Sequence, residues 1–226
     1  MKKITRESVQ DIYEIYDFHC DCWGWKDSND NWHLVRDGIE LTKGLKAKGV
    51  YSYSNRVWEW RDSSGNYHLM RDGDELTKGL KAKWVDLYYN NDWAWKDSSG
   101  NCHLMRDGIE LTQGMKAKRV YSYPYGDWTW RDSSGNWHLI RNGEELTTGI
   151  EAKEVYSYSN IERGCAWEWK DSNKNWHFIR NGIDVLSGLE AIETYIRENG
   201  DCEWRDSAGK WHLEEGKRCK KSLKKV

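Results

Sequence analysis

Residues 128–143 read WTWRDSSGNWHLIRNG, and this stretch decides the fold because it recurs six times in the 226-residue chain. Each copy holds W-x-W or its remnant, a Lys or Arg before Asp-Ser, a turn rich in Gly and Asn, and a His on a second apolar run. The copies begin at Trp23, Trp58, Trp93, Trp128, Trp167 and Cys202. Their His residues lie 35 residues apart, except for one interval of 39. A fixed period of this size predicts a tandem repeat architecture.

Composition limits the classes of protein that the chain could belong to. Sixteen Trp and thirteen Tyr stand beside two Phe, and the net charge is −2, so there is no global basic signal for nucleic acid. No apolar run approaches the ~20 residues of a membrane span, and the polar residues after Met1 do not resemble a signal peptide. The six Cys do not recur at one phase of the repeat, which favours reduced thiols over a disulfide framework. We therefore expect a cytoplasmic protein without a membrane partner.

One repeat unit, residues 50–84, predicts four short strands. Residues 50–53 (VYSY) alternate apolar and polar side chains, and residues 57–62 (VWEWRD) place both Trp on one face. A Ser-Ser-Gly-Asn loop then leads to a third strand at residues 67–71 (YHLMR), and a fourth strand begins at residues 75–77. Period-2 alternation puts His68 on the same face as Met70, so we expect each repeated His to lie at least partly inside.

Six such units predict an all-β fold, most simply a six-bladed β-propeller, because a small meander buries its faces only against neighbours. The alternative is an open β-solenoid of stacked meanders. Apolar residues at helical spacing in residues 183–199 favour a helix locally, but the repeat register predicts strands there. We expect one domain, residues 1–226, with units at approximately 15–49, 50–84, 85–119, 120–154, 155–193 and 194–226.

The repeat resembles a known family. Residues 58–66 (WEWRDSSGN) are similar to the WG β-repeat, whose units open Trp-Gly-Tyr/Phe-x-Asp-x-x-Gly, and residues 23–27 (WGWKD) are the most similar copy. The period and the number of units also resemble the tectonin and tachylectin-type lectin propellers, over residues 15 to about 215. This resemblance implies a six-bladed propeller and raises carbohydrate binding as a possible function. In the other copies the Gly is replaced by Glu59, Ala94, Thr129, Glu168 and Glu203.

The repeated polar and aromatic residues are interpreted as a structural framework, because an active site needs an asymmetric arrangement whereas these residues recur in every copy. A buried His needs hydrogen-bond partners, which a neighbouring Asp or Ser supplies. The repeated Asp before the Gly/Asn turn is explained by turn capping, so we expect no metal, no cofactor and no enzymatic activity. The framework residues are His33, His68, His103, His138, His177, His212, Trp58, Trp60, Trp93, Trp95, Trp128 and Trp130.

Two features near the chain ends suggest other functions. His19, Cys20 and Cys22 form half a zinc site, which Cys202 and Cys219 could complete if the ends meet. We favour buried, reduced thiols over this site. The basic segment from residue 217 to residue 225 could contact nucleic acid, but we favour a solvated tail. Apart from that segment, we expect no nucleic-acid binding.

Recognition should therefore depend on the residues that differ between copies. The largest deviations precede the W-x-W segments and should lie on one rim, where loops on a rigid scaffold commonly bind partners. The candidate binding residues are Tyr88, Tyr89, Asn90, Tyr123, Tyr125, Ile161, Glu162 and Arg163. We expect a non-catalytic protein–protein interaction module, such as a small stand-alone regulator or inhibitor of a larger complex. The alternative is a lectin-like carbohydrate-binding propeller.

Overall fold

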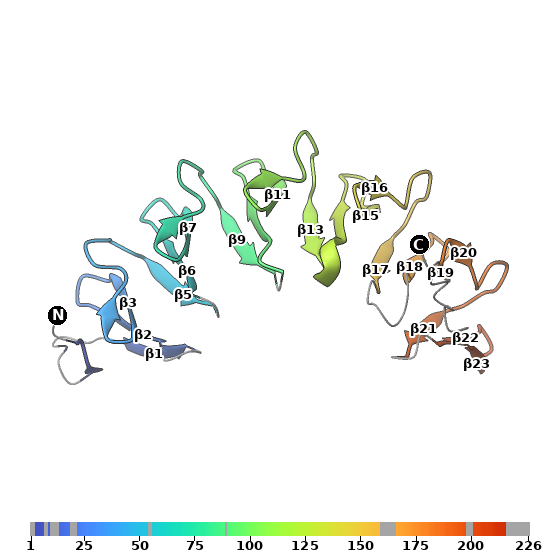
Figure 1. The fold of residues 1–226 in the computed structure, drawn as a ribbon, viewed down its shortest axis with the longest axis horizontal. Coiled ribbons are helices and arrows are strands. Elements are labelled where there is room, and N and C mark those ends of the chain that lie inside the picture. Colours follow the sequence, from blue (N-terminus) through green and yellow to red (C-terminus); the bar gives the residue numbers. More distant parts are fainter. Residues whose placement is uncertain are drawn as a thin grey trace, which may run out of the picture. The chain divides into compact units, whose positions relative to one another are not determined.

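The computed structural model describes residues 3–6, 9, 14–18, 22–53, 56–88, 90–158, 166–197 and 201–215. Its regular elements are antiparallel β-strands, with a short 3-10 helix, η2 (Pro124–Gly126), between two of them. The strands form six separate sheets that follow one another along the chain (Figure 1). No helix of the described residues is long and apolar enough to cross a membrane.

The first three sheets each contain four strands. The first contains β1 (Glu14–Phe18), β2 (Cys22–Lys26), β3 (Trp32–Arg36) and β4 (Ile39–Glu40). The second contains β5 (Gly49–Ser52), β6 (Val57–Arg61), β7 (Tyr67–Arg71) and β8 (Asp74–Glu75). The third contains β9 (Trp84–Leu87), β10 (Trp93–Lys96), β11 (Cys102–Arg106) and β12 (Ile109–Glu110).

The last three sheets repeat this order. The fourth contains β13 (Arg119–Ser122), β14 (Trp128–Arg131), β15 (Trp137–Arg141) and β16 (Glu144–Glu145). The fifth contains β17 (Glu154–Ser157), β18 (Ala166–Lys170), β19 (Trp176–Arg180) and β20 (Ile183–Asp184). The sixth contains β21 (Glu193–Ile196), β22 (Cys202–Arg205) and β23 (Trp211–Glu214) among the described residues.

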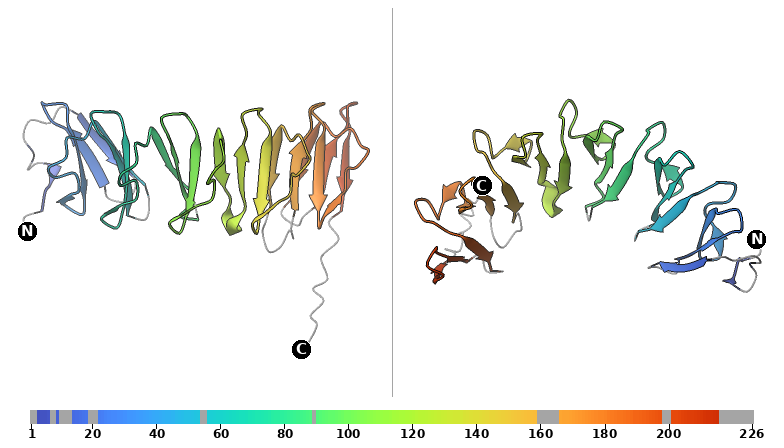
Figure 2. Two further views of the ribbon diagram at one scale, coloured as in Figure 1. Left: turned by 90° about the horizontal axis from the view of Figure 1, so that it is seen from above. Right: turned by 180° about the vertical axis from the view of Figure 1, so that it is seen from behind.

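The register within each sheet follows from the repeated sequence. In the fourth sheet the W-x-W strand β14 lies between β13 and β15, with Val120 opposite Trp130 and Trp130 opposite His138. Figure 2 shows from two further sides how each meander returns on itself. Strands β20 and β21 occupy the stretch with helical spacing, so the repeat register outweighs the local apolar pattern there.

The fourth strand of each unit is shorter than the sequence suggests. In the second sheet β8 covers Asp74–Glu75 alone, so the expected strand over residues 75–77 is wrong after its first residue. The chain leaves the sheet because Thr77 Oγ1 accepts a hydrogen bond of 2.9 Å from the backbone N–H of Leu69. The Thr77 carbonyl then accepts one from the N–H of Leu80, which closes a turn at Gly79, where φ is +82°.

The core consists of small layers that have the same composition in successive units. The residue after the His is fully buried on the third strand of five units, and the Ala that follows the turn after the fourth strand is also fully buried. The carbonyl of that Ala accepts a hydrogen bond at the start of the third strand, as in the 2.8 Å bond from Trp137 N–H to Ala152. The buried residues of these two positions are Leu34, Leu69, Leu104, Leu139 and Phe178, and Ala47, Ala82, Ala117, Ala152 and Ala191.

The strands group into two compact parts, one formed by residues 1–86 with 94–101 and the other by residues 87–93 with 102–226. Within both parts the unit is the same antiparallel meander, the element from which propeller blades are built. The chain is therefore an all-β repeat protein of the propeller type with six tandem units, and this prediction of the fold class is confirmed. The choice between a closed ring and an open stack stays a prediction.

Candidate functional site

The repeated His residues have nearly the same surroundings in successive units. In the first sheet the His33 ring stacks on Trp25 with ring centroids 4.0 Å apart, and its Nδ1 lies 2.7 Å from the carboxylate of Glu40. Its Nε2 faces the carboxylate of Asp27 at 3.4 Å. The same stack occurs for His68, His138, His177 and His212. An indole ring and at least one carboxylate thus lie against each of these imidazole rings. The purely structural role of the repeated His residues stays a prediction.

The repeated Asp residues hold the hairpin loops together. Asp27 Oδ1 accepts hydrogen bonds from the backbone N–H groups of Asn29 and Asn31, at 2.9 and 2.8 Å. Partial burial acts to raise the pKa of Asp27, but hydrogen bonds from Asn31, His33 and Asn29 lower it to about 2. Among the described residues there is no group of three or more His, Cys, Asp or Glu side chains that could hold a metal ion.

The described cysteines do not distinguish buried, reduced thiols from a zinc site near the chain ends. Cys22, Cys102 and Cys202 are buried, and burial raises the pKa of the Cys202 thiol to about 12. His19, Cys20 and Cys219 lie outside the described residues, as does the basic segment after residue 215. The proposed zinc site and the nucleic-acid contact of the tail stay untested hypotheses.

An Arg at the end of the third strand links successive sheets in the second compact part. The Asp127 carboxylate accepts a hydrogen bond of 2.9 Å from Arg141 Nε and lies 2.8 Å from its Nη2. The same guanidinium donates to Ser157 Oγ on β17 at 3.1 Å. Arg106 forms the equivalent pair with Asp92, at 2.7 Å. Both Asp side chains are 3% exposed, so these polar links are part of the interior.

Several predicted rim residues are used within the protein itself. Tyr88 donates from its hydroxyl to the Val120 carbonyl at 2.8 Å, and Tyr123 donates to the Val155 carbonyl at 3.3 Å. Burial raises the pKa of the Tyr123 hydroxyl to about 12. The amide of Asn90 donates to Asp92, to Ser122 and to the Tyr123 carbonyl. These side chains therefore connect neighbouring first strands.

Tyr125 is different, because it lies in η2 with 69% of its surface exposed and a φ of +74°. Its side chain is therefore accessible to solvent. Tyr89, Ile161, Glu162 and Arg163 lie outside the described residues. The rim assignment therefore stays a prediction that the described residues address only in part.

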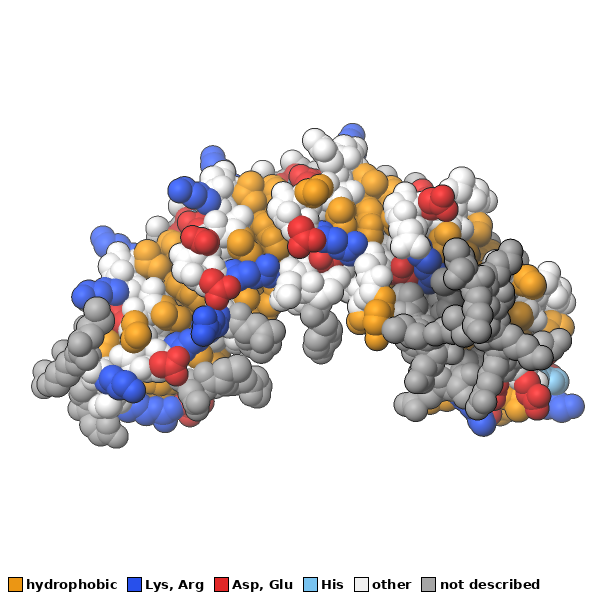
Figure 3. Space-filling view, in the orientation of Figure 1, with side chains coloured by type: hydrophobic (Ala, Val, Ile, Leu, Met, Phe, Trp, Pro, Cys, Tyr) orange, Lys and Arg blue, Asp and Glu red, His pale blue; other side chains and the backbone are white. Residues whose placement is uncertain are grey.

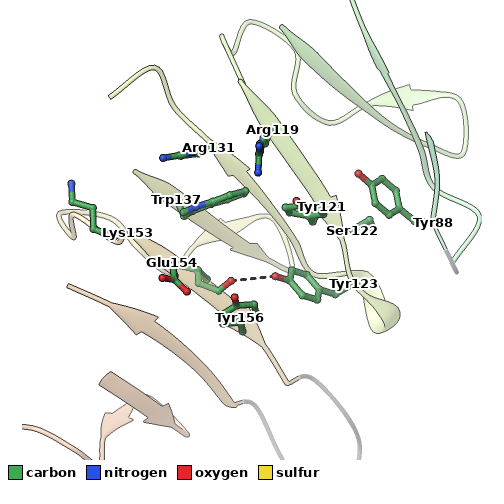
Figure 4. Close-up of a pocket in the computed structure, with 11 residues that line it drawn as sticks. Tyr88, Arg119, Tyr121, Ser122, Tyr123, Arg131, Trp137, Lys153, Glu154 and Tyr156 are labelled. Carbon is green, nitrogen blue, oxygen red and sulfur yellow. Dashed lines mark hydrogen bonds between the residues drawn. The ribbon is translucent and has the colours of Figure 1, made fainter. Parts of the chain in front are cut away.

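A pocket of about 590 Å³ lies in the second compact part, between the fourth sheet and β17. We name it the β13–β17 pocket. The fourth sheet contributes Arg119, Tyr121, Tyr123, Arg131 and Trp137, and the fifth contributes Lys153, Glu154 and Tyr156; Tyr88 lies at its edge (Figure 4). Its volume is within the ~300–1,000 Å³ usual for ligand sites. A second pocket, beside Gly49 and Arg61 in the second sheet, has about 180 Å³.

The walls of the β13–β17 pocket are aromatic and still partly exposed. Tyr121 is 44% exposed and Tyr156 is 45% exposed, at equivalent places on β13 and β17. Tyr121 stacks on Trp137 with ring centroids 5.6 Å apart and planes inclined by 26°. The Arg131 guanidinium lies over the same Trp137 ring, 6.0 Å from its centroid. The pocket thus presents a preformed aromatic surface under positive charge.

Ion pairs neutralise part of this charge, but not at the two arginines. Glu154 lies 3.2 Å from Lys170, and the Lys153 ammonium donates to Asn136 Oδ1 at 2.7 Å. Arg131 donates from Nε to the Gly135 carbonyl at 3.1 Å. Within the described part of the chain, no carboxylate pairs with Arg119 or Arg131. The pocket therefore carries excess positive charge.

Sequence reasoning nominated Tyr88 and Tyr123 but missed the other residues of this pocket. The predicted rim residues lie in the segments before the W-x-W strands, whereas most residues of the pocket lie within regular strands. Position 119 carried a usable signal. In the other units the equivalent residue is Glu14, Gly49, Trp84, Glu154 or Glu193, so an Arg there departs from the repeat.

Comparisons with known proteins give a likeness of fold. No protein-family model matches the chain, and no curated protein matches it. The computationally designed Ika8 protein is similar, at 12% identity and a TM-score of 0.42, over 92% of this chain and 75% of that one. The WD40 β-propeller domain of Doa1 is similar at 10% identity and a TM-score of 0.33, over 88% and 76% of the two chains.

YCF48 from Cyanidioschyzon merolae is similar at 10% identity and a TM-score of 0.38, over 94% of this chain and 87% of that one. At these values the likeness carries no information on ligand or partner. The chain is a tryptophan-rich repeat protein that resembles β-propellers. Its likeness to the WG repeat and to tectonin and tachylectin-type lectins stays a prediction from the sequence.

Proposed function

We propose that this chain is a non-catalytic binding module that acts through protein–protein interaction, with the β13–β17 pocket as its contact surface. The repeated His residues support this proposal because each contacts a carboxylate of its own unit, as for His33 between Glu40 and Asp27. Catalysis commonly needs one asymmetric arrangement of reactive side chains, whereas the surroundings of these His residues recur from sheet to sheet. Binding through a side-chain arrangement peculiar to one place in the repeat fits the molecule better.

The observation that carries the proposal is the exposed aromatic surface of Tyr121, Trp137 and Tyr156 beside unneutralised arginines. Figure 3 shows hydrophobic side chains exposed between charged ones over the repeated sheets. Tyr, Trp and Arg are the side chains most enriched among the residues that dominate binding energy in protein interfaces. A module of this kind would regulate or inhibit a larger complex in the cytoplasm by occupying one of its surfaces.

Affinity purification from the native host with mass spectrometry tests this function and the location of the surface. Wild type is compared with the double variant Tyr121→Ser/Tyr156→Ser and with Tyr125→Ser, which alters a more exposed tyrosine outside the pocket. Purified partner should then bind wild type and Tyr125→Ser with equal affinity and bind the double variant at least about tenfold more weakly. Loss with Tyr125→Ser alone would place the contact at the rim instead. Thermal unfolding of each variant establishes that the fold is retained.

A lectin is the second candidate, because exposed aromatic side chains recur on other sheets. Tyr51 is 47% exposed, Tyr195 is 61% exposed and Trp211 is 49% exposed. Aromatic platforms of this kind suit sugar rings, and a repeat protein with one site per sheet would bind several equivalents. Calorimetric titration with glycans selected on an array distinguishes the two candidates. Several equivalent sugar sites would favour the lectin, and one site for a protein would favour the interaction module.

A further inference from the structure

The first two strands of the fourth sheet lack a pair of opposite charges that the next two sheets have. The first residue of the first strand faces the last residue of the W-x-W strand. In the fifth sheet this pair is Glu154 and Lys170, at 3.2 Å, and in the sixth it is Glu193 and Arg205, at 2.6 Å. The fourth sheet places Arg119 opposite Arg131. Like charges in directly opposed positions destabilise a sheet, whereas opposite charges stabilise it.

The two arginines lie where a ligand could neutralise them. Both line the β13–β17 pocket, and both also line an adjoining hollow of about 400 Å³ beside Ser133 and Ser134. Arg119 is exposed, and its side chain makes no ion pair or hydrogen bond with any described residue. Figure 4 shows Arg119 and Arg131 close to Trp137, with Tyr121 on the same sheet. The unfavourable pair therefore coincides with the aromatic β13–β17 pocket.

We infer that the β13–β17 pocket binds an acidic peptide segment of a protein partner, with a carboxylate between Arg119 and Arg131 and a neighbouring apolar side chain against Tyr121, Trp137 and Tyr156. This inference rests on the proposed function and specifies the chemistry of the partner. Guanidinium groups favour carboxylates because they donate paired hydrogen bonds in a matching plane. The stacked rings supply a rigid apolar surface that loses little conformational freedom on binding.

A peptide suits this pocket better than a polyanion. Glu154 lies on the same wall, and Glu151 stands beside Lys153 at 3.8 Å, so negative charge borders the positive site. A long, uniformly charged backbone would meet this repulsion, whereas a peptide can place one or two carboxylates at the arginines and an apolar residue beyond them. The aromatic walls likewise favour a ligand that combines charge with an apolar side chain.

The decisive variant is Arg119→Glu, because it restores the charge pair of the fifth and sixth sheets. It should stabilise the fold, raising Tm by roughly 1–3 °C through an opposite-charge pair with Arg131. It should also abolish carboxylate binding. A residue with a merely structural role would not move stability and affinity in opposite directions. The control is Arg56→Glu, which makes the same change in net charge at a side chain that is 82% exposed and outside the pocket.

Binding is measured by fluorescence anisotropy with labelled synthetic peptides on the full chain. The probe peptide has a central Phe flanked by Glu residues, and its partner peptide carries Gln at every Glu position. Wild type and Arg56→Glu should bind the Glu peptide equally. Arg119→Gln should weaken binding about tenfold and Arg119→Glu about a hundredfold, the range expected for hydrogen bonds to a charged group. Raised salt should weaken binding of the Glu peptide because it screens the charges.

Each remaining outcome separates this inference from the proposed function. Equal binding of the Glu and Gln peptides would overturn the acidic ligand while leaving protein binding intact. If neither peptide binds while Tyr121→Ser/Tyr156→Ser still abolishes binding of a native partner, the acidic ligand is likewise overturned and protein binding is left intact. If heparin or single-stranded DNA binds more tightly than the Glu peptide, and Arg119→Glu weakens that binding, the ligand of the pocket is a polyanion and not an acidic peptide. Glycan binding at several equivalent sites would instead reject the proposed function itself.

Discussion

Replacing Asp127 by Ala should destabilise the protein strongly, because it removes the partner of a buried guanidinium. Arg141 is 10% exposed at its side chain and Asp127 is 3% exposed. Without the carboxylate, Arg141 keeps hydrogen bonds to Ser157 Oγ and to the Ala166 carbonyl, at 3.1 and 3.2 Å, but no opposite charge. Breaking a buried pair in this way costs about 3–5 kcal/mol.

The repeat offers a graded comparison for this effect. Arg106, the equivalent of Arg141, is 27% exposed beside Asp92. Water can therefore solvate its charge better after Asp92→Ala, and we expect that variant to cost about 2 kcal/mol, less than Asp127→Ala. Asp127→Ala should lower Tm by roughly 6–20 °C, since a domain of this size loses about 2–4 °C per kcal/mol.

Thermal unfolding followed by near-ultraviolet circular dichroism and tryptophan fluorescence measures these costs. Agreement between the two probes establishes a single transition. Glu151→Ala is the surface control, because that side chain is 79% exposed and should change stability by less than about 0.5 kcal/mol. The reasoning is refuted if Asp127→Ala unfolds at the same temperature as Glu151→Ala, or if Asp92→Ala loses as much stability as Asp127→Ala.

Three further substitutions test the interior. Gly24→Ala should cost about 1–3 kcal/mol in urea unfolding, because a Cβ there would lie 3.0 Å from the Phe18 ring; equal stability would contradict this packing. Thr147→Val should cost about 1–3 kcal/mol by orphaning the buried Leu139 N–H, and hydrogen exchange at that amide should accelerate. Burial raises the pKa of Glu59 from 4.5 to about 7, so its contribution to stability is present below about pH 4.5 and is lost as the pH rises through 7. Glu59→Gln should flatten the dependence of Tm on pH across this window, and an unchanged profile would refute the assignment.

The repeat accounts for most of what could be predicted. Period-2 alternation around residues 128–131 places Trp128 in the interior, and Ser-Ser-Gly-Asn closes the next hairpin through Asp132, whose carboxylate accepts from the N–H of Asn136. These are local properties, because they depend on neighbours a few residues away and recur with each copy. The fourth strand was overestimated because the hydrogen bond from Leu69 to Thr77 spans eight residues and ends the strand early.

The candidate site was predictable only in part, because it depends on contacts between sheets. Tyr123 looks like a free loop aromatic in sequence, but its hydroxyl reaches the Val155 carbonyl, 32 residues further along the chain. Tyr121 looks like an ordinary strand residue, yet it remains 44% exposed beside Trp137. Nothing in residue spacing alone distinguishes these two outcomes.

The sequence by itself determined the number of units, the strand order within each unit and the interior aromatic positions, because a short meander is specified by alternation and by turn residues. Tertiary structure alone decided which tyrosines form hydrogen bonds between sheets and which remain exposed. It also decided that Arg119 and Arg131 stand side by side at an aromatic pocket. The physical reason is that burial and charge pairing across sheets depend on how one unit packs on the next, and identical sequence patterns do not record that packing.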